Sequence, residues 1–498
     1  MRGASADELP PGLLAAGMMR HIISPMTDLT RLSAVEVSNL LRIGAVSPLD
    51  CLEALEKRIA AVNAPVNALV TLCFERARKH AARLMERPVH ERGRLAGLPV
   101  PIKDLCDVAG VRSTQGSPIF KDVIAAESDI VVRHLEGEGS VVYAMSNTPE
   151  FGAGAHTFNE VFGVTRNPWD TRLSASGSSG GAAVALATGM AWVAHGSDLG
   201  GSLRNPASFC GVVGMRPSPG RVAASVYSKI DSTLGVEGPM ARNVADLAFL
   251  FDAMVGAEAG DPLSLPREDV SYLAATKSGW KPRRVAVSRD LGISPVEPEI
   301  AELVLAAARK LEAEGVIVEE AHPDLADAMN AVQTLRALGY ATGMRQLLLD
   351  HRDKLKPEVI WNIEKGLKLT GDDIARAEAQ RGTLFRRMHA FLDTYDLLLC
   401  PTTIVAPFPV EIRYPTHCAD KEFTSYVDWL LIVGAITLCA CPAISIPCGF
   451  TQGNMPVGLQ IVAPNRGEAK LLAGAAFIEK VLGLGALTPI DPRVTHET

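Results

Sequence analysis

The chain has 498 residues, of which 47% are hydrophobic and 21% charged, and its formal net charge is −7. This composition is typical of a globular protein with a large buried core. The chain has no stripe of clustered lysine and arginine, which argues against nucleic acid as a partner. No stretch approaches 18 uninterrupted apolar residues, so a membrane-spanning helix is not expected.

The nine cysteines are odd in number and scattered, and several stand in apolar runs. Reduced core thiols of a cytoplasmic protein fit this pattern better than a disulfide framework. Cys439 and Cys441 form a Cys-x-Cys pair, but no histidine or cysteine follows at a spacing typical of zinc sites. We therefore expect no metal and no other cofactor.

Residues 1–28 predict a loose N-terminal segment without a targeting sequence. Their short apolar run follows Asp7 and Glu8, where a signal peptide would be basic. Three helices should follow. Ser33 has capping-box spacing, Pro48 suits the first position of a helix after Ser47, and a third helix is expected over 75–85.

A buried strand is expected next, at Val100 to Lys103, and another at Val141 to Met145. A lysine in such an apolar run can be a functional buried amine, or it can extend to the surface. Strand and helix patterns alternate as far as Gly256, which predicts an α/β sheet with helices on both faces.

Two clusters of glycine and serine flank an apolar run over 182–194. The first cluster is residues 177–181 and the second is residues 198–202. Such turns let backbone N–H groups point at one anion and place a serine hydroxyl beside them, as attack on a carbonyl requires. A single cluster would indicate only a linker or surface loop, but the apolar run between the two is too hydrophobic for a linker.

Residues 257–280 predict a connecting loop, and Val285 to Val287 predicts a short strand. The apolar spacing from Ile300 to Leu311 predicts an amphipathic helix that ends at Gly315. We expect a strand at residues 316–318. Residues 322–395 predict a polar helical insertion, with Asp372 as the cap of its last helix, and a strand follows at Leu397 to Cys400.

Several motifs together resemble the amidase signature family, which uses a Ser–cis-Ser–Lys triad. They are Pro101-Ile102-Lys103-Asp104, the cluster at 177–181, Asp198-Leu199-Gly200-Gly201-Ser202-Leu203-Arg204, Gly238-Pro239-Met240-Ala241-Arg242 and Pro442-Ala443-Ile444-Ser445-Ile446-Pro447. The resemblance implies an α/β fold, with a single large domain whose central mixed β-sheet is covered by helices on both faces. Residues 29–480 would form this domain, with an insertion at about 322–395, and 481–498 would form a C-terminal tail.

The resemblance also implies the roles of the site residues. Ser202 would be the nucleophile, Ser178 the cis-peptide serine and Lys103 the base, with its pKa lowered by burial. The backbone N–H groups of Leu199, Gly200, Gly201 and Ser202 would bind the oxyanion. Ser179, Asp198 and Arg204 would support the site, and the pocket would be lined by Phe151, Gly152, Ala153, Gly154, Leu430 and Val433.

The implied reaction is hydrolysis of a carboxylic amide to an acid and ammonia or an amine through a seryl acyl-enzyme. The amidase subunit of glutamyl-tRNA amidotransferase usually has an aspartate where Leu430 falls. An apolar residue there predicts a small, uncharged, hydrophobic or aryl amide as substrate. From the charge pattern and the lack of a long apolar stretch we expect no nucleic acid or membrane partner, and a homodimer is possible.

Two other functions stay open at this stage. One is that same amidotransferase subunit. The other is an esterase with a Ser-His-Asp triad, because residues 177–181 also fit a G-x-S-x-G elbow centred on Ser179, and Asp396 and His417 follow in the right order.

Overall fold

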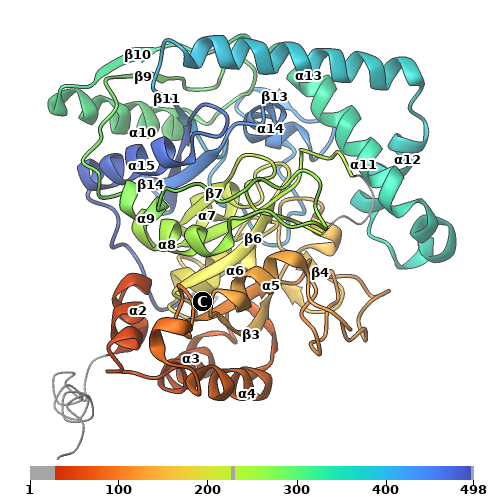
Figure 1. The fold of residues 1–498 in the computed structure, drawn as a ribbon. Coiled ribbons are helices and arrows are strands. Elements are labelled where there is room, and N and C mark those ends of the chain that lie inside the picture. The colour runs from red at the N-terminus through yellow and green to blue at the C-terminus, as the bar shows by residue number, and fades with distance from the viewer. Residues whose placement is uncertain (1–27, 226–229, 495–498) are drawn as a thin grey trace, which may run out of the picture.

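The computed structural model describes residues 28–225 and 230–494, and its largest sheet has eight strands in the order β10-β9-β11-β15-β14-β7-β8-β6 (Figure 1). Strands β10, β9 and β11 are parallel and the remaining neighbours are antiparallel, so the sheet is mixed, as expected. In chain order the strands are β6 (Val193–Asp198), β7 (Val213–Arg216), β8 (Val236–Ala241), β9 (Arg284–Val287), β10 (Ile317–Glu320), β11 (Leu397–Pro401), β14 (Ala443–Phe450) and β15 (Pro456–Val462).

A separate sheet of three strands stands beside the large one, in the order β1-β3-β2. Its strands are β1 (Leu69–Leu72), β3 (Val141–Ser146) and β2 (Pro99–Lys103). Strand β2 lies alongside β6, yet among the described residues no backbone ladder joins the two strands. We call this junction the β2–β6 seam. The sequence indicated β2 and β3 but not that they form a second sheet.

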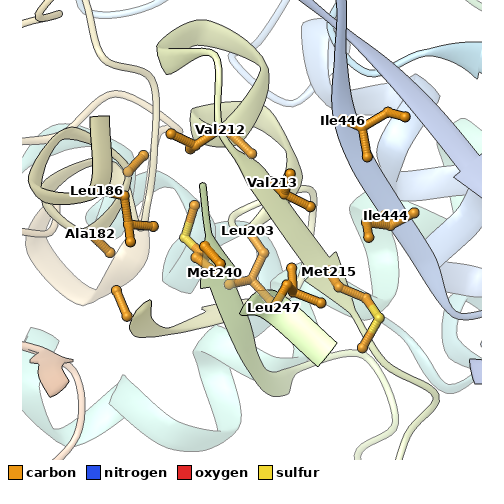
Figure 2. Close-up of a cluster of buried hydrophobic side chains, with 14 of the residues drawn as sticks. Ala182, Leu186, Leu203, Val212, Val213, Met215, Met240, Leu247, Ile444 and Ile446 are labelled. Atoms are coloured by element: carbon orange, nitrogen blue, oxygen red, sulfur yellow. The ribbon is translucent and has the colours of Figure 1, made fainter. Parts of the chain in front are cut away.

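Helices cover both faces of the large sheet, which confirms the expected fold class. Helices α6 (Gly180–Ala187) and α7 (Arg204–Cys210) pack together on one face, and α8 (Val244–Met254) and α15 (Glu468–Leu482) pack together on the other. Every residue of α6 is buried, as expected for a helix that is apolar all round. Figure 2 shows part of the buried core, to which α6 contributes Leu186, β7 Met215, β8 Met240 and α8 Leu247.

The N-terminal helices confirm the sequence patterns. Ser33 and Ser47 both form capping boxes, at α2 (Ala34–Arg42) and α3 (Pro48–Val62), and the third helix is α4 (Phe74–Met85). The remaining short elements before the centre of the chain are α5 (Ile130–Gly137), β4 (Phe158–Asn159) and β5 (Gly163–Val164). In Figure 1, α2 to α4 stand at one end of the molecule.

The region expected as a helical insertion contains three long helices at the opposite end of the molecule (Figure 1), namely α11 (Ala328–His351), α12 (Pro357–Leu367) and α13 (Gly371–Leu392). The expected cap at Asp372 is wrong. Thr370 caps α13 in a capping box with Asp373, because its hydroxyl accepts the Asp373 N–H, and Asp372 lies inside the first turn. The other elements are α9 (Tyr272–Ala275), α10 (Pro298–Arg309), β12 (His417–Cys418), β13 (Lys421–Glu422) and α14 (Leu431–Leu438).

Of the expected N-terminal segment only Asp28 is described, so that prediction otherwise lies outside the described residues. The expected C-terminal tail starts within α15, and its described part contacts the body of the fold through an ion pair of 2.7 Å between Arg58 and Asp491. Within 28–225 and 230–494, no helix is long and apolar enough to cross a membrane.

Candidate active site

The side chain of Lys103 crosses the β2–β6 seam and meets three serines. Its Nζ lies 2.7 Å from Ser178 Oγ, 2.9 Å from Ser179 Oγ and 3.0 Å from Ser197 Oγ. Lys103 is the last residue of β2, the first two serines precede α6, and Ser197 belongs to β6. Three elements far apart in the sequence thus bring one amine and three hydroxyls together, and the lysine is fully buried.

The loop before α6 is held very close to its surroundings. The peptide bond between Gly177 and Ser178 is cis. Gly181, in the first turn of α6, has no room for a side chain, since a Cβ atom there would lie 2.3 Å from the backbone nitrogen of Asn147. Ser179 joins this loop to the second cluster, because its N–H donates to the carbonyl of Ser202 at 3.1 Å. The two clusters are therefore in direct contact.

Asp198 organises the turn that carries Ser202. Its carboxylate accepts the N–H groups of Gly201 at 3.0 Å and Leu203 at 3.1 Å, and it pairs with the Arg204 guanidinium at 2.9 Å. Burial opposes the charge of Asp198, but Arg204 and Arg216 hold its pKa well below the usual range. The carboxylate therefore stays ionised and keeps the turn in one conformation.

This network corrects one sequence expectation. The N–H of Gly201 donates to Asp198 at 3.0 Å, so it is not free for an oxyanion. The N–H groups of Leu199, Gly200 and Ser202 have no such partner among the residues the structure describes. Gly201 instead provides the sharp turn, with φ at 93°.

Packing fixes the same turn from the other side. Leu203, which follows Ser202, is fully buried in the cluster of Figure 2. It packs so closely against Gly196 and Gly238 that a Cβ atom on either glycine would lie within 2.7 Å of the leucine side chain. A residue anchored in the core therefore sets the position of the serine before it.

Burial lowers the pKa of Lys103 to about 8, against a smaller opposing effect from the charge of Glu237. The neutral form of the amine is consequently far more abundant near neutral pH than in a free lysine, whose pKa is roughly 10.4. A neutral amine has a lone pair that can accept a proton, and Ser178 Oγ is the nearest hydroxyl.

A cavity of about 390 Å³ opens in front of these groups. Ser178, Ser202 and Leu199 line it, together with Phe151 and Gly152 from the expected pocket loop. Gly152 lies so near the serine that a Cβ atom there would be 3.4 Å from Ser178 Oγ. The backbone of the loop therefore forms one wall of the cavity beside the serines.

The other expected pocket residues lie elsewhere. Ala153 is fully buried, and its carbonyl accepts a hydrogen bond of 2.6 Å from Lys356 Nζ, because the loop docks there on the insertion. Gly154 lies beside the same amine. Leu430 lines a smaller apolar hollow next to Leu199 and Gly200.

Val433 packs against Gly201, where a Cβ atom would lie 2.6 Å from the valine side chain. Its contact is therefore with the serine turn rather than with the main cavity.

Four polar residues at this site were not predicted from the sequence: Ser197, which contacts Lys103, His195, which accepts the Lys103 N–H, and Glu237 and Arg336 in the cavity wall. Ser197 and His195 directly precede the second cluster, so their position in the sequence was a usable signal. Glu237 and Arg336 belong to β8 and α11, and only the fold brings them here.

The residues expected for an esterase triad do not meet. The hydroxyl of Ser179 is bound by Lys103, and Asp396 pairs with Lys470 at 2.8 Å. His417 is exposed on β12. No hydrogen bond links any two of Ser179, Asp396 and His417 within the described part of the chain.

Comparison with known proteins agrees with this geometry. The family model described as Amidase matches residues 50–472. An acylamidase of Rhodococcus erythropolis is 35% identical over 93% of this chain and 98% of its own length. One subunit of the glutamyl-tRNA(Gln) amidotransferase of Halothermothrix orenii is 31% identical over 93% of this chain and 99% of its own length.

Among solved structures, a bacterial aryl acylamidase of the amidase signature family superimposes with a TM-score of 0.86. It shares 27% identity and the match covers 93% of this chain and all of that one. With its fold, its motifs and these relatives in agreement, the chain belongs to the amidase family and is a hydrolase that acts on amides.

Proposed function

We propose that the protein hydrolyses an amide by a Lys103–Ser178–Ser202 relay. The observation that supports it most strongly is the distance of 2.7 Å between the buried Lys103 amine and Ser178 Oγ. Neutral Lys103 accepts the proton of Ser178 as Ser178 accepts that of Ser202, and Ser202 Oγ attacks the carbonyl carbon.

The tetrahedral oxyanion forms beside the turn at residues 199–202. The N–H groups of Leu199, Gly200 and Ser202 are the donors available to it there. Ser178 then returns a proton to the leaving nitrogen as the carbon–nitrogen bond breaks. Water, activated through the same relay, attacks the acyl-enzyme and releases the acid.

The substrate we propose is a hydrophobic or aryl amide that is uncharged where it meets the serine turn. The hollow beside Leu199 and Gly200 is lined mainly by apolar residues, with Arg336 and Thr437 as its polar members, and among the described residues it contains no carboxylate that could bind an ammonium group. The free and mostly buried cysteines support a cytoplasmic location. A homodimer stays a prediction.

A panel of aliphatic, aryl and amino-acid amides tests the substrate class by release of ammonia or amine. We expect aryl and hydrophobic acyl amides to have the highest kcat/KM. Release of ammonia from glutamine alone would contradict the proposal and favour the amidotransferase subunit. Leu430→Asp provides a matched variant, which should weaken hydrophobic substrates selectively.

A further inference from the structure

Behind the lysine, a buried histidine bridges the β2–β6 seam. His195 belongs to β6, and its Nδ1 accepts the backbone N–H of Lys103 at 3.3 Å. Its Nε2 lies 2.8 Å from a carboxylate oxygen of Glu237, on the neighbouring strand β8. His195 is fully buried, and the Glu237 side chain is 18% exposed in the cavity wall.

This geometry fixes the tautomer of the imidazole. A backbone N–H can only donate, so Nδ1 carries no proton and Nε2 holds the ring proton that is donated to Glu237. The arrangement also replaces a missing ladder bond. Since no backbone hydrogen bonds join β2 to β6 among the described residues, the imidazole satisfies the N–H of Lys103 that would otherwise be buried without a partner.

A metal site is a competing interpretation. Ligand atoms of Cys106, His195 and Glu237 lie within 4.8 Å of one another. Both ring nitrogens of His195 are already hydrogen bonded, and burial raises the pKa of the Cys106 thiol well above its usual value, so that thiol is neutral. The hydrogen bonds of His195 to Lys103 and Glu237 therefore account for this pair without a metal ion.

We propose that Glu237 and His195 are positioning residues for Lys103: the imidazole holds its backbone at the seam, and the carboxylate, which lies in the cavity wall, exerts a fixed negative charge on the amine. This inference rests on the proposed role of Lys103 as the base. Because the charge of Glu237 favours the ammonium form, it opposes the effect of burial and keeps the lysine from losing its proton too readily.

The other titratable groups near Glu237 are either neutral or paired with an opposite charge. Lys103 belongs to β2, and the neutral Cys106 lies in the turn after it. The negative charges of Asp129 and Asp107 help to raise the pKa of the Cys106 thiol. On β6 stand His195 and Asp198, and the charge of Asp198 is paired with Arg204 and Arg216. Glu237 has no lysine or arginine partner among the described residues, and its charge comes first among those that raise the pKa of Lys103.

Glu237→Gln tests the charge without removing the hydrogen bond, because the amide oxygen can still accept from His195. We expect the rising limb of kcat/KM against pH to move to lower pH by on the order of one unit. Glu422→Gln, on the exposed strand β13, is the matched control and should leave the limb in place. A Glu237→Gln limb that coincides with the wild-type limb would overturn the proposal.

Histidine variants test the position of the backbone. His195→Leu leaves the Lys103 N–H unpaired, and kcat should fall on the order of a hundredfold with little change in KM. His195→Asn places an acceptor where Nδ1 lies and should recover most of that loss. Equal kcat values for His195→Leu and wild type, or equal losses for the two variants with both folded by thermal melting, would count against the positioning role.

The Lys103→Met variant distinguishes failure of the proposed function from failure of the present inference. If Lys103→Met keeps the wild-type limb, the lysine is not the base and the proposal of the previous subsection fails. If Lys103→Met removes the limb while Glu237→Gln leaves the wild-type one unmoved, only the present inference fails.

Discussion

Two buried lysines stand on either side of the pocket loop, and they differ in what surrounds the amine. Lys103 meets the hydroxyls of Ser178, Ser179 and Ser197. Lys356, at the start of α12, donates to the carbonyl of Ala153 at 2.6 Å and lies 4.9 Å from the ring centre of Phe158. Burial lowers the pKa of each to about 8.

The two lysines show that a lowered pKa does not by itself make an amine a catalytic base. A lowered pKa makes an amine available as a base, but a base also needs an acidic proton within reach. A carbonyl and an aromatic ring offer none. Lys356 therefore anchors the insertion to the pocket loop, and its neighbours Glu150 and Glu358 oppose the effect of burial there.

The largest effect in the serine cluster should come from Ser202→Ala, which removes the proposed nucleophile and leaves the fold intact. We expect turnover to fall by at least about a thousandfold. Mapping the adduct of a fluorophosphonate probe checks the assignment on the wild type. An adduct on Ser179 would contradict the relay and restore the esterase interpretation.

Ser178→Ala should cost nearly as much, because the hydroxyl that lies between amine and nucleophile is lost. We expect kcat to fall on the order of a hundred- to a thousandfold with KM little changed. A smaller loss for Ser178→Ala than for Ser179→Ala, measured on the same amide, would show that the lysine acts through the other serine.

A smaller effect should appear in stability. The pKa of Lys103 is about 8 in the folded protein and roughly 10.4 in an unfolded chain, so the folded state loses stability as pH falls from about 10 to about 8, and the full loss is present below about pH 8. Lys103→Met should therefore raise the free energy of unfolding near pH 7 by on the order of 1–3 kcal/mol. The gain should shrink as pH rises from about 8 to about 10, as urea unfolding at several pH values can test.

An unchanged difference between Lys103→Met and wild type across this range would mean that the folded-state proton affinity is ordinary. Lys356→Met is the internal comparison. Burial lowers the pKa of Lys356 to about 8 as well, so the gain of Lys356→Met should also shrink as pH rises from about 8 to about 10.

The sequence was most informative where local pattern and chemistry coincide. The capping box at Ser33, the helix start at Pro48, the buried strand at Lys103 and the paired glycine–serine clusters were all predicted, because each depends on neighbouring residues. The second sheet was not, since strand pairing depends on contacts between distant segments.

Dependence on contacts between distant segments also explains why the pocket residues were not all predicted from the sequence. Leu430 and Val433 were expected in it from a family pattern, but their side chains pack around the Gly200–Gly201 turn. Gly201 was expected to donate to an oxyanion, and only the three-dimensional position of Asp198 shows that its N–H is already used. Glu237 is close to Lys103 only because β8 pairs with β6.

The most direct test of the account is the dependence of kcat/KM on pH in Lys103→Met and Lys356→Met, measured beside wild type with one aryl amide. Because the neutral amine is the active form, wild-type kcat/KM should rise with pH through about 8. Lys356→Met should keep this limb and lose less than about tenfold in rate, chiefly through KM. Lys103→Met should lose orders of magnitude and show no such limb, whereas a folded Lys103→Met that keeps the wild-type rate and limb would contradict the central claim.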